Sequence, residues 1–200
     1  MTLWFLARSA GFMALAGATL AIVLGARSSG PAVTRLEHRE SRVLLQLAHR
    51  SAAVVTLALL ALHAVLLVLD SHVAISAPGA LVPFTAGYRG TAVGLGSLAA
   101  YCLLVVALVG ALRGRLAGSP GAVRWWRPVH ALAYAVWPLS IGHGLWSGTD
   151  SRTWWALTLY AASAVAVVTA LWSRLVAEED HAARPLALAR HEIQRAGRSA

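Results

Sequence analysis

The sequence predicts an all-α, polytopic membrane protein, a bundle of about five transmembrane helices. Of the 200 residues, 58% are hydrophobic and only 12% are charged, whereas soluble domains average about 25% charged residues. Apolar stretches of about 20 residues, the length that crosses the roughly 30 Å apolar core of a bilayer, recur along the chain. The 17 basic residues are all arginine, and most of them flank these stretches.

The five expected spans account for residues 1–175, which we treat as one membrane domain. Their boundaries are 3–25, 43–69, 91–112, 129–147 and 154–175. The first span differs from a signal peptide, in which positive charge precedes the apolar run, because Arg8 lies within it and further arginines follow it. We therefore expect this span to be retained as a helix.

The distribution of arginine predicts the orientation of the bundle. Basic residues are dense in the connections 26–42 and 113–128 and in the tail 176–200, but the opposite side carries only Arg8, Arg89 and Arg152. By the positive-inside rule, the N-terminus lies outside and the C-terminus inside. The tail is then a cytoplasmic, arginine-rich segment, and we expect a multi-pass protein of the plasma membrane.

Composition also excludes several classes of function. The net charge of +9 does not indicate nucleic-acid binding, because the arginines flank apolar segments as the positive-inside rule requires. The single cysteine, Cys102, lies within a span, and the chain has no C-x-x-C-H motif for covalent haem attachment. A cysteine-ligated iron–sulfur cluster is excluded for the same reason.

Four histidines inside two of the spans are the candidate metal ligands. His49 and His63 are separated by 14 residues, and His130 and His143 by 13. Each pair therefore extends over roughly 20 Å of helix, which places one imidazole near each membrane face. The predicted topology brings His49 level with His130 on the inner side, and His63 level with His143 on the outer side.

This pattern predicts two stacked b-type haems, each held by two axial histidines. Ionisable side chains within a bilayer are costly and usually functional. Zinc is a weaker alternative, because zinc requires its ligands in one small sphere. The remaining histidines fall in the connections and the tail, where we expect them to be solvated: His38, His72, His181 and His191.

The spacing of the second pair raises a geometrical difficulty. At about 100° per residue, a separation of 13 misses the same helix face by about 140°. Pro138 lies between His130 and His143, and a proline permits a kink because it removes a backbone hydrogen bond. We expect Pro138 to re-aim His143. Trp137, midway between the two histidines, either packs in the bundle or lies between the two haems.

Three arginines are candidate partners for the haem propionates. Arg50 and Arg127 lie beside His49 and near His130, and would serve the inner haem, although anchoring at the inner face explains them equally well. Arg8 lies towards the outer side of the first span, where a charge needs a partner, and an outer-haem propionate would serve. Snorkelling to the outer headgroups is its alternative.

These residues resemble the ferric-reductase-like transmembrane domain family, shared by ferric reductases, NADPH oxidases and the haem subunit of bacterial methionine-sulfoxide repair. The similarity covers about residues 3–175. It rests on Ala7-Arg8-Ser9-Ala10-Gly11, on His49-Arg50 followed by His63, and on Trp126-Arg-Pro-Val-His130 followed by His143. The segment His143-Gly-Leu-Trp-Ser-Gly-Thr-Asp150 is similar to the end of the second haem helix in stand-alone actinobacterial members.

The resemblance implies transmembrane electron transfer as the membrane subunit of a ferric-reductase-like oxidoreductase. Two departures matter: six spans are usual in the family, and the oxidases continue into domains that bind FAD and NAD(P)H. Among these 200 residues we find no G-x-G-x-x-G fingerprint after a strand. Electrons are therefore expected from a separate cytoplasmic flavoprotein or from quinol, and an extracytoplasmic acceptor would receive them.

Two other functions remain open at this point. One is the haem-containing membrane anchor of a periplasmic methionine-sulfoxide reductase system. The other is a haem-free membrane scaffold or small-solute carrier. The visible absorption spectrum separates the second of these from the haem proteins.

Overall fold

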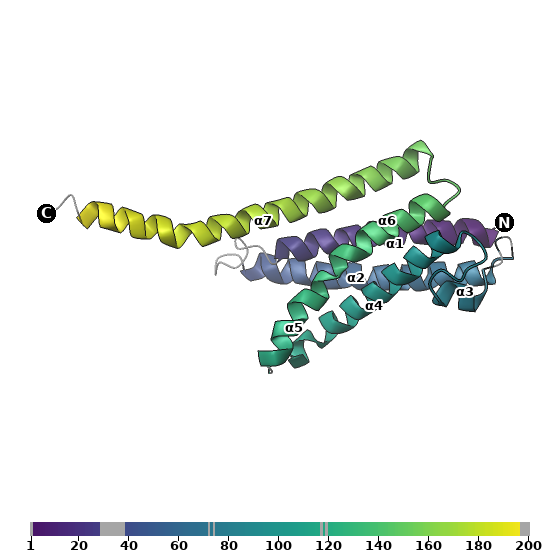
Figure 1. Cartoon of the computed structure of the whole chain (residues 1–200), viewed down its shortest axis with the longest axis horizontal. Helices are drawn as coiled ribbons and strands as arrows, with labels where there is room; N and C mark the ends of the chain where they lie inside the picture. The colour runs from purple at the N-terminus through teal and green to yellow at the C-terminus, as the bar shows by residue number, and fades with distance from the viewer. Residues whose placement is uncertain are drawn as a thin grey trace.

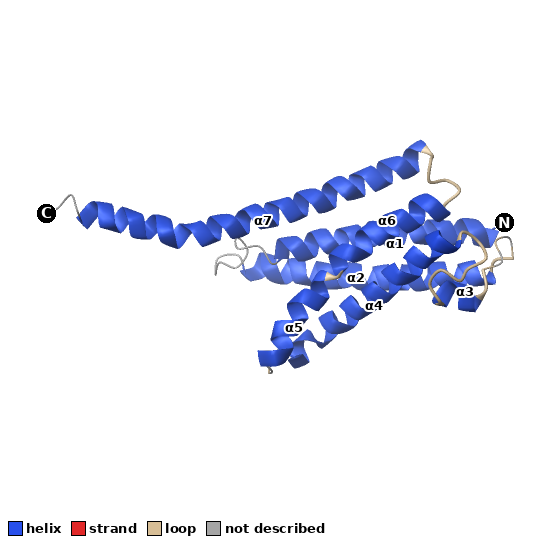
Figure 2. Ribbon diagram, in the orientation of Figure 1, coloured by secondary structure: helices blue, strands red, loops and turns tan. Residues whose placement is uncertain are grey.

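The protein is a bundle of α-helices, and no strand occurs in the residues that the structure describes. It is a computed structural model, which describes residues 2–28, 39–71, 73, 75–116, 118 and 120–196. The helices are α1 (Thr2–Ser28), α2 (Arg39–Leu69), α3 (Ala77–Leu81), α4 (Gly90–Leu116), α5 (Pro120–Ala131), α6 (Ala133–Ser147) and α7 (Trp154–Ala196). The all-α bundle predicted from the sequence is confirmed (Figure 2).

Four helices of the described chain are long and apolar enough to cross a membrane. They span Thr2–Ser28, Glu40–Leu69, Gly90–Arg115 and Trp154–Val176. Many large apolar side chains on them are exposed, including Leu44, Val54 and Trp172 at 66–69%. A soluble protein rarely exposes so much apolar surface, so these faces suit contact with lipid. The chain is thus a membrane protein by the length and apolar character of its helices.

The expected span 129–147 is built from two helices instead of one. A tight turn at Leu132 separates α5 from α6, with backbone N–H groups of Leu132 and Ala135 bonded three residues back, to Val129 and Leu132 (3.1 and 2.9 Å). We expected Pro138 to interrupt this segment, but Pro138 lies inside α6. Proline removes the bond to the residue four positions earlier, here Tyr134, so the turn that loosens precedes the proline.

Helix α1 is the centre of the packing. It packs most extensively against α2 and also contacts α6 and α7, while α4 packs mainly against α6 and α5. The buried face of α1 consists largely of alanine: Ala7, Ala10, Ala14, Ala18, Ala21 and Ala26. Small residues let helix backbones approach closely in a membrane, where packing replaces the hydrophobic effect as the source of association.

Figure 1 shows the two chain ends at opposite ends of the long axis of the bundle. Helix α7 continues beyond the other helices to Ala196, so the expected boundary at residue 175 lies within one helix. At the end of the bundle near the N-terminus, α3 and the neighbouring loops cover the helix ends. At the other end, α4 and α5 diverge from α1 and α2 in this view.

Candidate functional site

The four intramembrane histidines meet as two pairs, each contributed by α2 and by the α5–α6 segment. The ring centres of His49 and His130 are 6.2 Å apart, and those of His63 and His143 are 6.1 Å apart. The rings of each pair are nearly perpendicular, at 74° and 83°. These are the pairs that the sequence analysis expected to be level. The tight turn at Leu132 helps to explain how two histidines 13 residues apart serve one side, because a 3₁₀ turn advances by about 120° per residue.

The separation within each pair fits two imidazoles on opposite sides of one metal ion. With metal–nitrogen bonds of about 2.1 Å and about 1.2 Å from a ring nitrogen to its ring centre, trans imidazoles place their ring centres about 6.5 Å apart. No group of three or more His, Cys, Asp or Glu side chains suited to a metal occurs in the described parts of the chain. A site with two protein ligands suits a metal that carries four in-plane donors of its own, as a haem iron does.

Backbone carbonyl groups hold three of the four imidazoles. Nδ1 of His63 lies 2.6 Å from the carbonyl oxygen of Ala7, Nδ1 of His49 lies 2.8 Å from that of Ala21, and Nδ1 of His143 lies 2.8 Å from that of Ala92. A carbonyl oxygen only accepts, so Nδ1 must carry the proton and donate. This leaves the lone pair of Nε2 free for a metal, an arrangement in which the carbonyl orients the ligand and increases its basicity.

Each histidine also packs on a glycine of the neighbouring helix. A Cβ atom built on Gly11 would lie 3.0 Å from the ring of His63, and one on Gly25 would lie 3.1 Å from that of His49. On α4, the corresponding distances are 2.6 Å from Gly96 to His143 and 3.3 Å from Gly110 to His130. The four glycines therefore form four cradles, and any side chain at Gly96 would displace the ring.

The cradles explain how the carbonyl groups become accessible. In a helix, the Cα–Cβ bond tilts towards the N-terminus, so the side chain at one position shields the carbonyl group one turn earlier. Gly11 follows Ala7 by four residues, and Gly96 follows Ala92 by the same interval. The missing side chain opens a path to a carbonyl oxygen whose second lone pair can accept the imidazole proton.

The sequence analysis missed these glycines, although a signal for them existed. Gly11 and Gly25 are 14 residues apart in α1, and Gly96 and Gly110 are 14 apart in α4. The same interval separates His49 from His63. Two antiparallel helices with equally spaced features bring both features together at once, so the matched spacing would have predicted the contacts.

A cavity of about 210 Å³ lies at the outer pair, and His63, His143, Arg8 and Tyr88 are among its lining residues. Most of its lining is apolar, which suits the body of a haem. The outer loop contributes Ile75, Ala80 and Tyr88 to the lining. The sequence left open whether this loop caps the site, and here it forms part of the wall.

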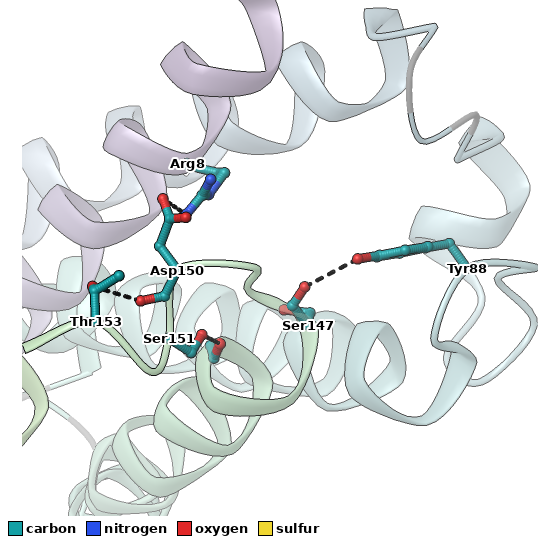
Figure 3. A network of polar contacts seen from close by, with 7 residues as sticks. Arg8, Tyr88, Ser147, Asp150, Ser151 and Thr153 are labelled. Atoms are coloured by element: carbon teal, nitrogen blue, oxygen red, sulfur yellow. Dashed lines mark hydrogen bonds and ion pairs between the residues drawn. The ribbon is translucent and has the colours of Figure 1, made fainter. Parts of the chain in front are cut away.

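Polar contacts hold this outer wall in place. Ser97 Oγ donates to the carbonyl of Ala80 (2.7 Å), and the Tyr101 hydroxyl donates to that of Leu81. At the end of α6, Tyr88 donates to the carbonyl of Ser147 (3.3 Å), and Arg89 to that of Trp146 (2.7 Å). Figure 3 shows Tyr88 reaching Ser147 from the opposite side of the site.

Arg8 forms an ion pair with Asp150, a partner that the sequence analysis did not identify. Asp150 lies in the loop between α6 and α7, and Figure 3 shows Arg8 reaching it from α1. The Arg8 side chain is only 11% exposed, and its Nε has no hydrogen-bond partner among the described residues. The ion pair therefore provides the partner that a charge within a span requires, and leaves donors of the guanidinium at the outer cavity.

The other predicted residues are placed less informatively. Arg50 and Arg127 are both exposed, as anchoring residues at a membrane face would be. Trp137 packs against Leu15, Ala156 and Tyr160, which favours the packing role. His38 and His72 lie outside the described residues, as do the side chains of His181 and His191.

Comparison of the chain with protein-family models, with curated proteins and with solved structures finds no match. The ferric-reductase-like resemblance therefore rests on the residues quoted for it.

The cradles give a test of the packing that does not depend on any cofactor. We expect Gly96→Ala to destabilise the protein by about 1–3 kcal/mol, the usual result of forcing an extra methyl group into a packed site. Thermal unfolding in detergent, followed by circular dichroism, measures the change. Gly114→Ala, in the same helix with nothing within 4 Å of its added Cβ, is the control and should be neutral or slightly stabilising. Equal effects of the two substitutions would contradict the cradle.

Proposed function

We propose that this protein transfers electrons across a membrane through two b-type haems, each ligated by two histidines. The observation that carries the proposal is the pair of histidine contacts, at 6.2 and 6.1 Å between ring centres, on two levels of one bundle. A haem, when bound, supplies reversible one-electron iron chemistry. The part of the chain is to ligate it, to fix its level in the membrane and to control access to it.

The residues of each level have distinct tasks under this proposal. His49 and His130 ligate the inner group, and His63 and His143 the outer one. Three carbonyl groups fix ring orientation and proton position, as is usual for histidines that bind metals. Arg8, already paired with Asp150, offers its remaining donors to an outer propionate. Arg50 and Arg127 serve the inner propionates from the exposed side.

The wider assignment follows from the resemblance and from charge. The chain is proposed as the membrane subunit of a ferric-reductase-like system in the plasma membrane, with the N-terminus outside. A separate flavoprotein or quinol donates electrons on the cytoplasmic side, and an extracytoplasmic acceptor removes them. The arginines that flank α4 and α5 are suited to docking an acidic donor: Arg113, Arg115, Arg124 and Arg127.

The first prediction concerns haem content. Purified protein should contain two haems per chain, both six-coordinate and low-spin, as measured by the pyridine haemochrome assay and visible spectroscopy. Because the ring planes are nearly perpendicular at both levels, the ferric protein should give strongly anisotropic low-spin EPR signals. Protein without haem would contradict the proposal, and one haem per chain would contradict the two-site form.

The second prediction concerns pairing within each level. His63→Ala and His143→Ala should each remove the outer haem and leave the inner one, and His49→Ala and His130→Ala should do the reverse. The two members of a pair control for each other, because they lie on different helices and share only the site. Redox titration of the remaining haem identifies which level survives. Loss of a haem at the opposite level would show that the pairing is wrong.

The third prediction concerns the electron source. The 200-residue protein alone should not oxidise NADPH, even with ferric chelate present, because its sequence has no recognised nucleotide site. Added flavoprotein or quinol should reduce its haems. Reduction by an acidic flavoprotein should slow as salt rises, since ionic strength screens docking between charged surfaces; reduction by quinol provides the salt-insensitive control. Stoichiometric FAD and rapid NADPH oxidation by the isolated protein would overturn this division.

A further inference from the structure

His130 differs from the other three histidines in how it is held. The equivalent acceptor for its Nδ1 is the carbonyl of Val106, four residues before Gly110. Nδ1 of His130 nevertheless makes no well-formed hydrogen bond with any described residue. The Cβ distance is also the longest of the four, 3.3 Å at Gly110 against 2.6 Å at Gly96. The imidazole therefore lies less deeply in its cradle.

The ring of Trp126 covers His130 instead. The two rings are stacked, with their centres 5.1 Å apart and their planes inclined by only 15°. On α4, the guanidinium carbon of Arg113 lies 4.6 Å from the centre of the Trp126 ring. The indole N–H has no hydrogen-bond partner among the described residues, so Trp126 contributes its ring face. Trp125, by contrast, is 67% exposed.

We infer that Trp126, supported by Arg113, is the positioning residue of the inner ligand His130, in the role that a backbone carbonyl has at the other three histidines. The sequence analysis grouped Trp126 with the interfacial tryptophans, and its neighbour Trp125 fits that description. A stacked indole restricts rotation of the imidazole about its side-chain bonds, and a cation over the indole stabilises the stack. The inference rests on the proposed haem function and adds a specific role within it.

The two levels should differ electronically as a result. A hydrogen bond from Nδ1 to a carbonyl makes an imidazole more basic and favours the ferric state. His130 lacks that bond, and the positive charge of Arg113 lies beyond Trp126, where it favours the reduced state. Both effects raise the reduction potential of the inner haem relative to one held as the outer haem is.

The experiment compares matched variants of the full-length, haem-loaded protein. Trp126→Leu removes the ring face, Trp126→Phe restores a flat ring, and Trp125→Leu controls for loss of an adjacent tryptophan. Arg113→Gln removes the cation, and Arg115→Gln, exposed in the same last turn of α4, is its control. EPR spectra and redox titrations report both haems in one sample, so the outer haem serves as an internal standard.

Trp126→Leu should shift the inner-haem EPR signal or lower inner-haem occupancy, with the outer haem unchanged, and Trp126→Phe should restore the signal. Arg113→Gln should lower the inner-haem potential while Arg115→Gln leaves it unaltered. An unchanged inner signal in Trp126→Leu, an equal effect of Trp125→Leu, or no recovery with phenylalanine would overturn the inference. Absence of haem from the unsubstituted protein would reject the proposed function itself, so the two failures are distinguishable.

Discussion

The imidazole groups inside an apolar bundle must have their polar atoms satisfied, and the helix register of this protein follows from that constraint. A buried polar group without a partner is costly where water is absent. The helices supply partners by leaving glycine one turn after an acceptor, at Gly11 after Ala7, for example. A shift of α2 along α1 by one residue would separate both of its histidines from their carbonyls. The sites and the packing are therefore one structure.

Close helix approach is the second condition that these contacts require. The alanine-rich face of α1 permits it along the whole length of α2. Between the two histidine levels, Thr56 is 2% exposed, and a Cβ at Gly17 would lie 2.5 Å from its hydroxyl oxygen. Its hydroxyl donates to the carbonyl of Ala52 within its own helix (2.7 Å). The helices thus remain in contact between the levels, which keeps the separation of the two levels fixed.

The two levels are built differently, in a way that suits vectorial transfer. At the outer level, an outer loop, the Tyr88–Ser147 contact and the Arg8–Asp150 ion pair enclose a cavity. The inner level has instead an aromatic stack that extends from His130 through Trp126 to the exposed Arg113. Under the proposed function, the outer wall restricts which acceptors approach, and the inner stack lies on the side where a donor docks.

The sequence by itself determined the class of the fold and the members of each pair. Apolar length identifies a spanning helix because the bilayer has a fixed thickness, and charge asymmetry ordered the spans well enough to predict His49 beside His130 and His63 beside His143. Only the tertiary structure decided what surrounds these histidines: the glycine cradles, the Arg8–Asp150 pair, the stacking of Trp126 and the turn at Leu132 in place of Pro138. These features depend on the register and rotation of one helix against another. Periodicity along a single helix reports which face is apolar, but it does not report which residue of the neighbouring helix that face meets.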